Sequence, residues 1–376
     1  MLSAHRAIGV AFLLNGIGWA SWASRLPAIS ENLRISEGAL GVALLAATAG
    51  LFASAVASDR LIHRFGSRRV TVGAGLVMAA TLPAIGWSPG YPAFVAALLV
   101  FGLGNGAFDV ASNAQAVGLE RRGDRSILSG IHAFFSGGAI VGAASAALLV
   151  AGQVPVGIHL PAVGVVIGLT LLLVAGGLLQ DERAPEPPAR LALPRGPLLG
   201  FAALAFCVLL AEGAVFDWSA VYLTSVAAAP AALAAAGLAI FQAAMLVGRT
   251  VGDRLADRFR ADRLVRWGTL LGVGGMLLAI LLPAPITTLL GYVVLGLGIA
   301  ASFPLTLSAA ARTPGVPAPT AIASTTAAGY VGFVVGPPLI GLVAELSGLR
   351  IGLGVVVVVL VAATLLAGRL RREAQA

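Results

Sequence analysis

The chain has 376 residues, of which 59% are hydrophobic and only 11% are charged, and its mean hydropathy is +0.96. A soluble globular protein carries about 25% charged residues, so this composition excludes a water-soluble fold of this length. The formal net charge of +8 lies in short basic clusters between apolar runs, a pattern that favours a membrane-topology signal over nucleic-acid binding.

Twelve apolar runs are long enough to cross a bilayer, whose hydrocarbon core of about 30 Å needs roughly 20 helical residues. The first run is long and lacks a small-residue cleavage site, so we expect a retained first helix and not a cleaved signal peptide. The runs predict an all-α membrane protein. They lie near residues 7–26, 38–57, 70–87, 92–118, 127–151, 157–179, 198–223, 231–251, 264–282, 286–311, 318–344 and 349–368.

The basic residues, all of them arginine, predict the orientation of these spans, because cytoplasmic loops of membrane proteins carry an excess of positive charge. With the N-terminus placed in the cytoplasm, 21 of the 24 arginines fall on the cytoplasmic side. Only Arg25, Arg34 and Arg350 fall on the other side. We therefore expect a multi-pass protein of the bacterial inner (plasma) membrane with both termini in the cytoplasm.

Residues 181–197, DERAPEPPARLALPRGP, form the one stretch rich in both proline and charge. This composition is typical of a linker. It predicts a cytoplasmic connection between an N-terminal six-helix half, residues 1–180, and a C-terminal six-helix half, residues 198–376.

The two halves also share sequence, which indicates an internal duplication. A single shift of 194 residues brings three separated segments into register, and chance matches among the 48 glycines are the alternative explanation. The shift superposes Asp59-Arg60-Leu61 on Asp253-Arg254-Leu255, Gly102 and Gly104 on Gly296 and Gly298, and Gly138 and Gly142 on Gly332 and Gly336.

A basic segment follows the second span of each half. The first copy is Asp59-Arg60-Leu61-Ile62-His63-Arg64-Phe65-Gly66-Ser67-Arg68-Arg69, and the second is Gly252-Asp253-Arg254-Leu255-Ala256-Asp257-Arg258-Phe259. With the paired six-helix halves, these segments resemble the signature of the major facilitator superfamily, roughly G-x-x-x-D-R-x-G-R-R. The first copy departs from it by Asp59 at the leading glycine, His63 at the usual acidic position and Ser67 at one arginine. The second copy departs from it by Arg260 at the later glycine.

The resemblance implies two six-helix halves related by a pseudo-twofold axis along the membrane normal. It also implies a latch on the cytoplasmic side, in which acids and arginines pair as the halves rock. The alternative is that these charges only set the topology. The latch residues would be Asp59, Arg60, Arg64, Gly66, Asp253, Arg254, Asp257 and Arg258.

Three further segments resemble an uncharacterised bacterial inner-membrane branch related to fucose permeases. They are residues 128–135, LSGIHAFF, residues 109–115, DVASNAQ, and the stretch from Glu212 to Leu223 that contains Asp217-Trp218-Ser219. The resemblance implies a secondary transporter whose substrate is a small hydrophilic solute.

Polar residues inside the predicted spans are costly in lipid and are therefore the candidate functional residues. Asn105, Asp109 and Asn113 recur every four residues and so share one helix face. Asp109 would lie about 14 Å from the cytoplasmic end of its span, near the bilayer midplane. Because desolvation disfavours its charged form, we expect Asp109 to bind and release a proton. A permanently hydrogen-bonded aspartate that fixes helix packing is the alternative.

Two further residues are candidates for proton coupling. His132 lies level with Asn113 and could pair with Asp109, although a satisfied buried histidine explains it equally well. Glu212 lies in the outer half of the seventh span.

An arginine and an aspartate predict an outer gate. Arg25 ends the first span and Asp217 lies near the outer end of the seventh. A pair of Arg25 with Asp217, or of Arg25 with Glu212, would close the outer mouth. An ordinary interface position is the alternative for Asp217. The remaining predicted cavity residues are Asn15, Trp19 and Gln242, with packing against lipid as the alternative for Trp19.

These residues predict a proton-coupled secondary transporter of a sugar-like solute or organic acid that works by alternating access. The alternatives are proton-driven efflux of an amphipathic or drug-like compound, and an uncoupled facilitator or sensor on the same fold. We expect no enzyme activity, because the chain lacks a nucleophile–base pair, a HExxH motif and a Walker A motif. We also expect no cofactor and no metal. The expected partners are the solute, protons and the lipid bilayer, but no nucleic acid, and the chain should be a monomer.

Overall fold

The computed structural model describes residues 2–122, 128–180, 194–256 and 258–368, and the secondary structure of these residues is helical. The described chain forms two compact units. The first comprises Met1–Pro188 with Ala231–Ala239, and the second comprises Ala189–Pro230 with Ile240–Ala376. Most of the predicted linker lies outside the described residues, so the predicted boundary between the halves stays a prediction.

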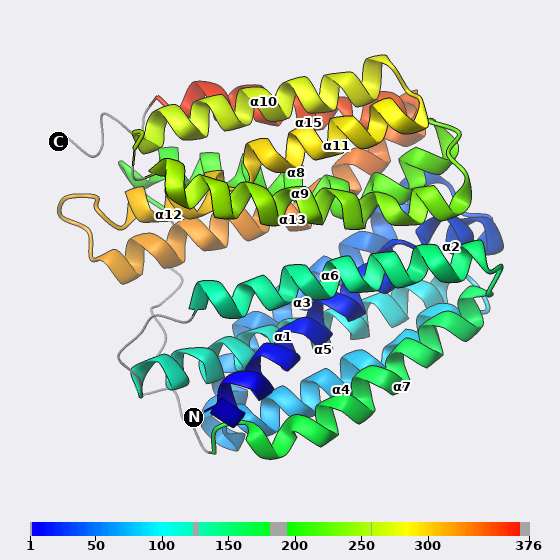
Figure 1. The fold of residues 1–376 in the computed structure, drawn as a ribbon, viewed down its shortest axis with the longest axis horizontal. Helices are drawn as coiled ribbons and strands as arrows, with labels where there is room; N and C mark the ends of the chain where they lie inside the picture. Colours follow the sequence, from blue (N-terminus) through cyan, green and yellow to red (C-terminus); the bar gives the residue numbers. More distant parts are fainter. Residues whose placement is uncertain (1, 123–127, 181–193, 257, 369–376) are drawn as a thin grey trace. The chain divides into compact units, whose positions relative to one another are not determined.

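The first unit is built mainly from seven α-helices and a short 3-10 turn, which Figure 1 traces from blue to green. Within it α1 packs against α6, α3 against α5, and α4 against both α5 and α7. The bounds are α1 Leu2–Ala23, α2 Leu26–Leu33, α3 Glu37–Phe65, α4 Ser67–Gly86, α5 Tyr91–Arg121, α6 Leu128–Ala151, α7 Val156–Val174 and η1 Ala175–Gly177.

The second unit repeats this pattern. Helix α8 packs against α13 and α15, and α10 against α11 and α15. Helix α9 belongs to this unit from Ile240 on, while Ala231–Ala239 belong to the first unit. The bounds are α8 Leu198–Ser225, α9 Ala231–Ala256, α10 Ala261–Leu281, α11 Pro285–Ile299, α12 Ser302–Ala310, α13 Ala318–Ser347, α14 Leu349–Gly352 and α15 Gly354–Leu366.

Within the described residues, eleven segments are long and apolar enough to cross a membrane. The pair α1 and α2 makes a twelfth if it is one span, bent by 43° at its break. The prediction of an all-α membrane protein with about twelve spans is therefore confirmed. The bend explains why the first span ends earlier than predicted: α1 stops at Ala23, and the chain turns before α2 begins at Leu26.

The first signature segment differs from the expected loop. Helix α3 continues to Phe65 and α4 begins at Ser67, so Asp59, Arg60 and Arg64 occupy the last turns of α3. The connection consists of Gly66 alone, whose φ of 82° and ψ of 150° lie in a region that only glycine adopts readily. The glycine of the motif is therefore explained by the sharp joint between two helices.

The second copy lacks that glycine for a visible reason. Helix α9 ends at Ala256, and α10 begins only at Ala261. Arg260, which occupies the position of Gly66, precedes α10 with a φ of −68° and a ψ of 140°, an extended conformation open to any residue. A longer connection thus removes the need for a positive φ.

Glycines on the helices allow close backbone contact, as small residues do in membrane bundles. A side chain on Gly102 of α5 would collide with the carbonyl oxygen of Ala47 on α3. The corresponding pair at a shift of 194 residues is Gly296 of α11 and Phe241 of α9. A Cβ added to Gly296 would lie only 3.0 Å from the carbonyl oxygen of Phe241. The glycines that match in sequence therefore make matching contacts, which supports the internal duplication.

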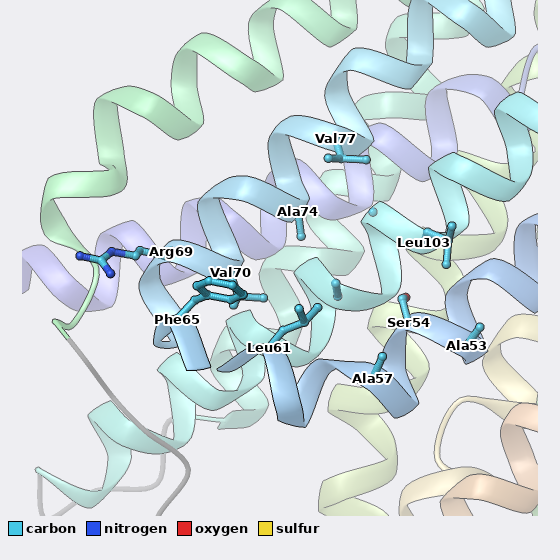
Figure 2. A pocket seen from close by; sticks show the side chains of 12 residues that line it. Ala53, Ser54, Ala57, Leu61, Phe65, Arg69, Val70, Ala74, Val77 and Leu103 are labelled. Carbon is cyan, nitrogen blue, oxygen red and sulfur yellow. The ribbon is translucent and has the colours of Figure 1, made fainter. Parts of the chain in front are cut away.

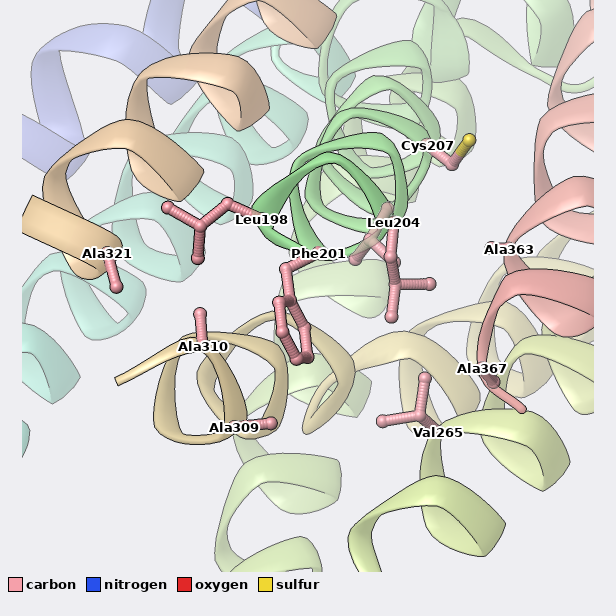
Figure 3. Packing of buried hydrophobic residues seen from close by; sticks show 11 residues of the cluster. Leu198, Phe201, Leu204, Cys207, Val265, Ala309, Ala310, Ala321, Ala363 and Ala367 are labelled. Carbon is pink, nitrogen blue, oxygen red and sulfur yellow. The ribbon is translucent and has the colours of Figure 1, made fainter. Parts of the chain in front are cut away.

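Helices α3, α4 and α5 leave a groove of about 610 Å³ on the first unit, whose lining residues Figure 2 shows. Its lining is apolar apart from Ser54 and Arg69. In the second unit, an apolar cluster around Phe201 and Leu204 joins α8 to α10, α12, α13 and α15 (Figure 3). This cluster fixes the position of α8, the helix that carries Glu212 and Asp217.

Candidate functional site

The first unit contains a group of three asparagines around one aspartate, which we call the Asp109 cluster: Asn15, Asn105, Asp109 and Asn113. Asn15 Nδ2 donates to Asp109 Oδ1 at 3.3 Å, and Asn113 Nδ2 donates to Asp109 Oδ2 at 3.3 Å. Asn105 Nδ2 in turn donates to Asn15 Oδ1. The cluster therefore links the middle of α1 to the middle of α5.

The local sequence explains half of this arrangement. Positions 105, 109 and 113 share one face of α5, as expected for residues four apart. Asn113 also donates to the backbone carbonyl of Asp109 at 2.9 Å, which holds its amide beside the carboxyl. Asn15 and Asn105 are buried, and Asp109 is half-buried. The contact from Asn15 is tertiary, because 94 residues separate it from Asp109.

The chemistry of the Asp109 cluster depends on its neutral partners. Among the described residues, the groups that donate to the Asp109 carboxyl are amides, and no arginine forms an ion pair with it. An asparagine amide carries both donors and an acceptor, so it can serve a carboxylate through N–H and a protonated carboxyl through its oxygen. The cluster can therefore accommodate Asp109 with or without a proton.

His132 lies on α6 with an exposed side chain. Its ring packs edge-on against Phe12 of α1, with 5.1 Å between the ring centroids. Phe12 precedes Asn15 by one turn of α1, so His132 lies near the helix that contributes to the cluster. The pairing of His132 with Asp109 stays a prediction.

The second unit contains an ion pair between two helices. Arg249 Nη2 on α9 lies 3.3 Å from Glu212 Oε1 on α8. The Glu212 side chain is 12% exposed and that of Arg249 is 37% exposed, so the carboxyl is the enclosed partner. Glu212 occupies the middle of α8, an apolar span of 28 residues.

Arg249 is a residue that the sequence reasoning missed. The arginine pattern assigns Arg249 to the cytoplasmic side, whereas the structure places it within α9 and against Glu212. Gln242, a predicted cavity residue, is buried two turns earlier on the same helix. The signal available in the sequence was that Arg249, like Gln242, lies inside the predicted apolar run 231–251. The predicted excess of arginine on the cytoplasmic side remains when Arg249 is left out of it.

The predicted outer gate is divided between the two units. Arg25 lies buried between α1 and α2, where its Nη2 donates to the carbonyl oxygen of Val154 at 2.7 Å. Among the described residues, its Nε and Nη1 have no hydrogen-bond partner. Asp217 is buried on α8 of the second unit. The pairing of Arg25 with Asp217 therefore stays a prediction.

Trp19 belongs to an aromatic group at the junction of α1 and α5. Its ring centroid lies 5.6 Å from that of Trp22 and 5.7 Å from that of Phe101. Packing between helices thus accounts for much of its surface, and its role in a substrate cavity stays a prediction.

The predicted latch residues that the structure describes lie at or just beyond helix ends. Arg60 and Arg64 are exposed in the last turns of α3, and Arg64 lies over the ring of Phe65 at 5.2 Å. Arg254 and Arg258 are exposed at and after the end of α9. Asp257 and the side chain of Asp253 lie outside the described residues, so the latch stays a prediction.

Comparison with known proteins identifies the family. The model of the Major Facilitator Superfamily matches residues 8–325. The chain belongs to the major facilitator superfamily. It is 34% identical to an uncharacterized MFS-type transporter of Yersinia pestis, over 93% of this chain and 91% of that protein. It is 35% identical to an uncharacterized transporter of Sinorhizobium fredii, over 93% and 94% of the two chains.

Solved structures agree on the fold. A bacterial homolog of the human lysosomal transporter Spinster superposes with a TM-score of 0.76 over 99% of this chain and 97% of that chain, at 13% identity. The nucleoside transporter NupG superposes with a TM-score of 0.76 over 98% of both chains, at 14% identity. The E. coli fucose:proton symporter FucP superposes with a TM-score of 0.63 over 97% of both chains, at 16% identity. The family model and the relatives above 30% identity show that the protein is a multi-pass membrane transporter of this superfamily and not an enzyme.

Proposed function

We propose that this major facilitator superfamily protein moves a small hydrophilic solute across the bacterial inner membrane by alternating access, and that Asp109 carries the coupled proton. The observation that carries this proposal is the Asp109 cluster. Its amides surround a carboxyl without fixing its charge, as a proton carrier requires. An arginine partner would hold the carboxylate in its charged form throughout the cycle.

Glu212 takes a different role in this proposal. Its contact with Arg249 supplies a counter-charge, so the pair contributes a balanced polar surface for the solute and not the proton site. Buried charges inside membrane spans are typical of substrate and ion pathways. His132 and the pair of Arg25 and Asp217 remain proposed as a proton relay and an outer gate.

The class of solute rests on the polar character of these sites. Amides and a charge pair can replace the water around hydroxyl, carboxylate or amine groups. The nucleoside and fucose transporters that share the fold also support a hydrophilic solute, and the fucose:proton symporter supports coupling to protons. Efflux of an amphipathic compound and uncoupled facilitation are the competing functions.

The experiment begins with a thermal-shift screen of the purified protein against sugars, nucleosides, organic acids and amines, because a ligand stabilises the state that binds it. A radiolabelled hit is then offered to proteoliposomes under an imposed pH gradient. A difference of one pH unit can sustain about tenfold accumulation for one proton per solute.

We expect the parent protein to accumulate the solute, and Asp109→Asn to exchange it across the membrane without accumulation. Glu31→Gln, which changes an exposed carboxyl on α2, is the control and should behave as the parent does. Full accumulation by Asp109→Asn would refute the proton assignment. A parent protein that only equilibrates the solute would support a facilitator instead.

A further inference from the structure

The groove between α3, α4 and α5 shares no lining residue with the Asp109 cluster, and the proposed proton and solute sites do not use it. Its apolar side chains remain exposed in the folded chain, Leu61, Phe65, Val77 and Leu103 among them. Figure 2 shows the groove from close by. The lining consists of Ala53, Ser54, Ala57, Leu61 and Phe65 of α3, Arg69, Val70, Ala74 and Val77 of α4, and Leu103, Gly104 and Ala107 of α5.

The dimensions of the groove match one leaflet of a bilayer. From Arg69 to Val77 the groove follows eight residues of α4, or about 12 Å, and from Phe65 back to Ala53 it follows twelve residues of α3, or about 18 Å. Half of a hydrocarbon core of about 30 Å is about 15 Å. An acyl chain that enters at the membrane surface would therefore fill the groove toward the midplane.

One end of the groove is basic. Arg69 lies in the first turn of α4 and lines the groove, where Figure 2 shows it at the same end as Phe65. Arg64 lies over the ring of Phe65, which is itself part of the lining. The apolar groove thus begins beside Arg69 at the helix ends, where a phospholipid places its phosphate.

We propose that this groove binds an anionic phospholipid, with one acyl chain between α3, α4 and α5 and the phosphate at Arg69. A phospholipid joins an anion to an apolar chain in one molecule, as the groove joins a cation to an apolar lining. The bound lipid would span the joint at Gly66, where α3 meets α4. This site is independent of the proposed transported solute.

The test uses a fluorescent reporter in the groove. The variant Leu61→Trp, placed in nanodiscs of phosphatidylcholine, is titrated with dibrominated phosphatidylglycerol or with dibrominated phosphatidylcholine. Bromine quenches tryptophan at contact, and the unmodified protein gives the background from the five native tryptophans. We expect phosphatidylglycerol to quench the reporter at about fivefold lower mole fraction, because an arginine near the membrane surface contributes about that factor.

In the same reporter background, Arg69→Gln should remove this preference and Arg69→Lys should keep it. Arg266→Gln, which removes an exposed arginine on α10, is the matched control and should leave it unchanged. Equal quenching by the two lipids in the reporter protein, or a preference that survives Arg69→Gln, would overturn the proposal. Competition by chain-free glycerophosphoglycerol would overturn the part played by the groove. Loss of quenching as protein dimers form would show that a second copy covers the groove.

Discussion

Replacing Arg249 by glutamine removes the cation from Glu212 while the carboxyl stays enclosed on α8. The two charged atoms lie 3.3 Å apart. Coulomb's law gives about 1.3 kcal/mol for this separation in water and about 5 kcal/mol at an effective dielectric constant of 20. Because the Arg249 side chain is 37% exposed, screening by solvent brings the interaction energy of the pair toward the lower of these two values. We expect a coupling energy of about 1–2 kcal/mol.

A double-mutant cycle measures this coupling directly. The free energy of unfolding in mixed micelles is determined for the parent, Glu212→Gln, Arg249→Gln and the double variant. The pair of Arg260 and Asp262 serves as the control, since its atoms are closer, at 3.0 Å, but its arginine is 48% exposed. Exposed pairs contribute about 0.2–1 kcal/mol, so this pair should couple more weakly.

Two outcomes would refute the reasoning. A Glu212–Arg249 coupling below about 0.3 kcal/mol lies within the usual scatter of additivity and would mean that the two charges do not stabilise each other. A control pair that couples more strongly than Glu212 and Arg249 would mean that burial on α8 does not strengthen the interaction. Exchange of the charges, with Glu212→Arg and Arg249→Glu combined, should restore part of the stability lost in either single variant.

Three further predictions concern the joint, the first unit and the gate. Gly66→Ala should lower the free energy of unfolding by about 1–3 kcal/mol, because alanine is strained at the φ of 82° found there. The control Gly73→Ala, in α4 where no atom lies within 4 Å of an added Cβ, should be neutral or stabilising, and equal effects of the two variants would contradict the backbone strain at Gly66. Gln115→Leu should lower the free energy of unfolding by about 2–4 kcal/mol. Buried Gln115 forms hydrogen bonds of 2.7–2.9 Å with Ser67 Oγ and with both the N–H and the carbonyl oxygen of Leu179, and a loss below about 1 kcal/mol would contradict their importance. Arg25→Ala and Asp217→Ala should have non-additive effects on transport rate, and additive losses would count against the gate.

The close agreement between the predicted spans and the helices has a local cause. The length of an apolar run decides whether a helix can cross the hydrocarbon core, and that property needs no knowledge of neighbouring helices. The shared face of Asn105, Asp109 and Asn113 follows in the same way from the period of the helix. The continuation of α3 from residue 57 to Phe65 could not be predicted from the sequence, because a charged helix end and a charged loop have the same composition.

The sequence by itself determined the membrane class, the number of spans, the repeat at 194 residues and the candidate face around Asp109. Only the tertiary structure decided which side chains meet: Asn15 with Asp109, and Arg249 with Glu212. These partners lie 94 and 37 residues apart in the chain. Their contact depends on the rotation and spacing of packed helices, which close glycine contacts set and which no local pattern of residues records.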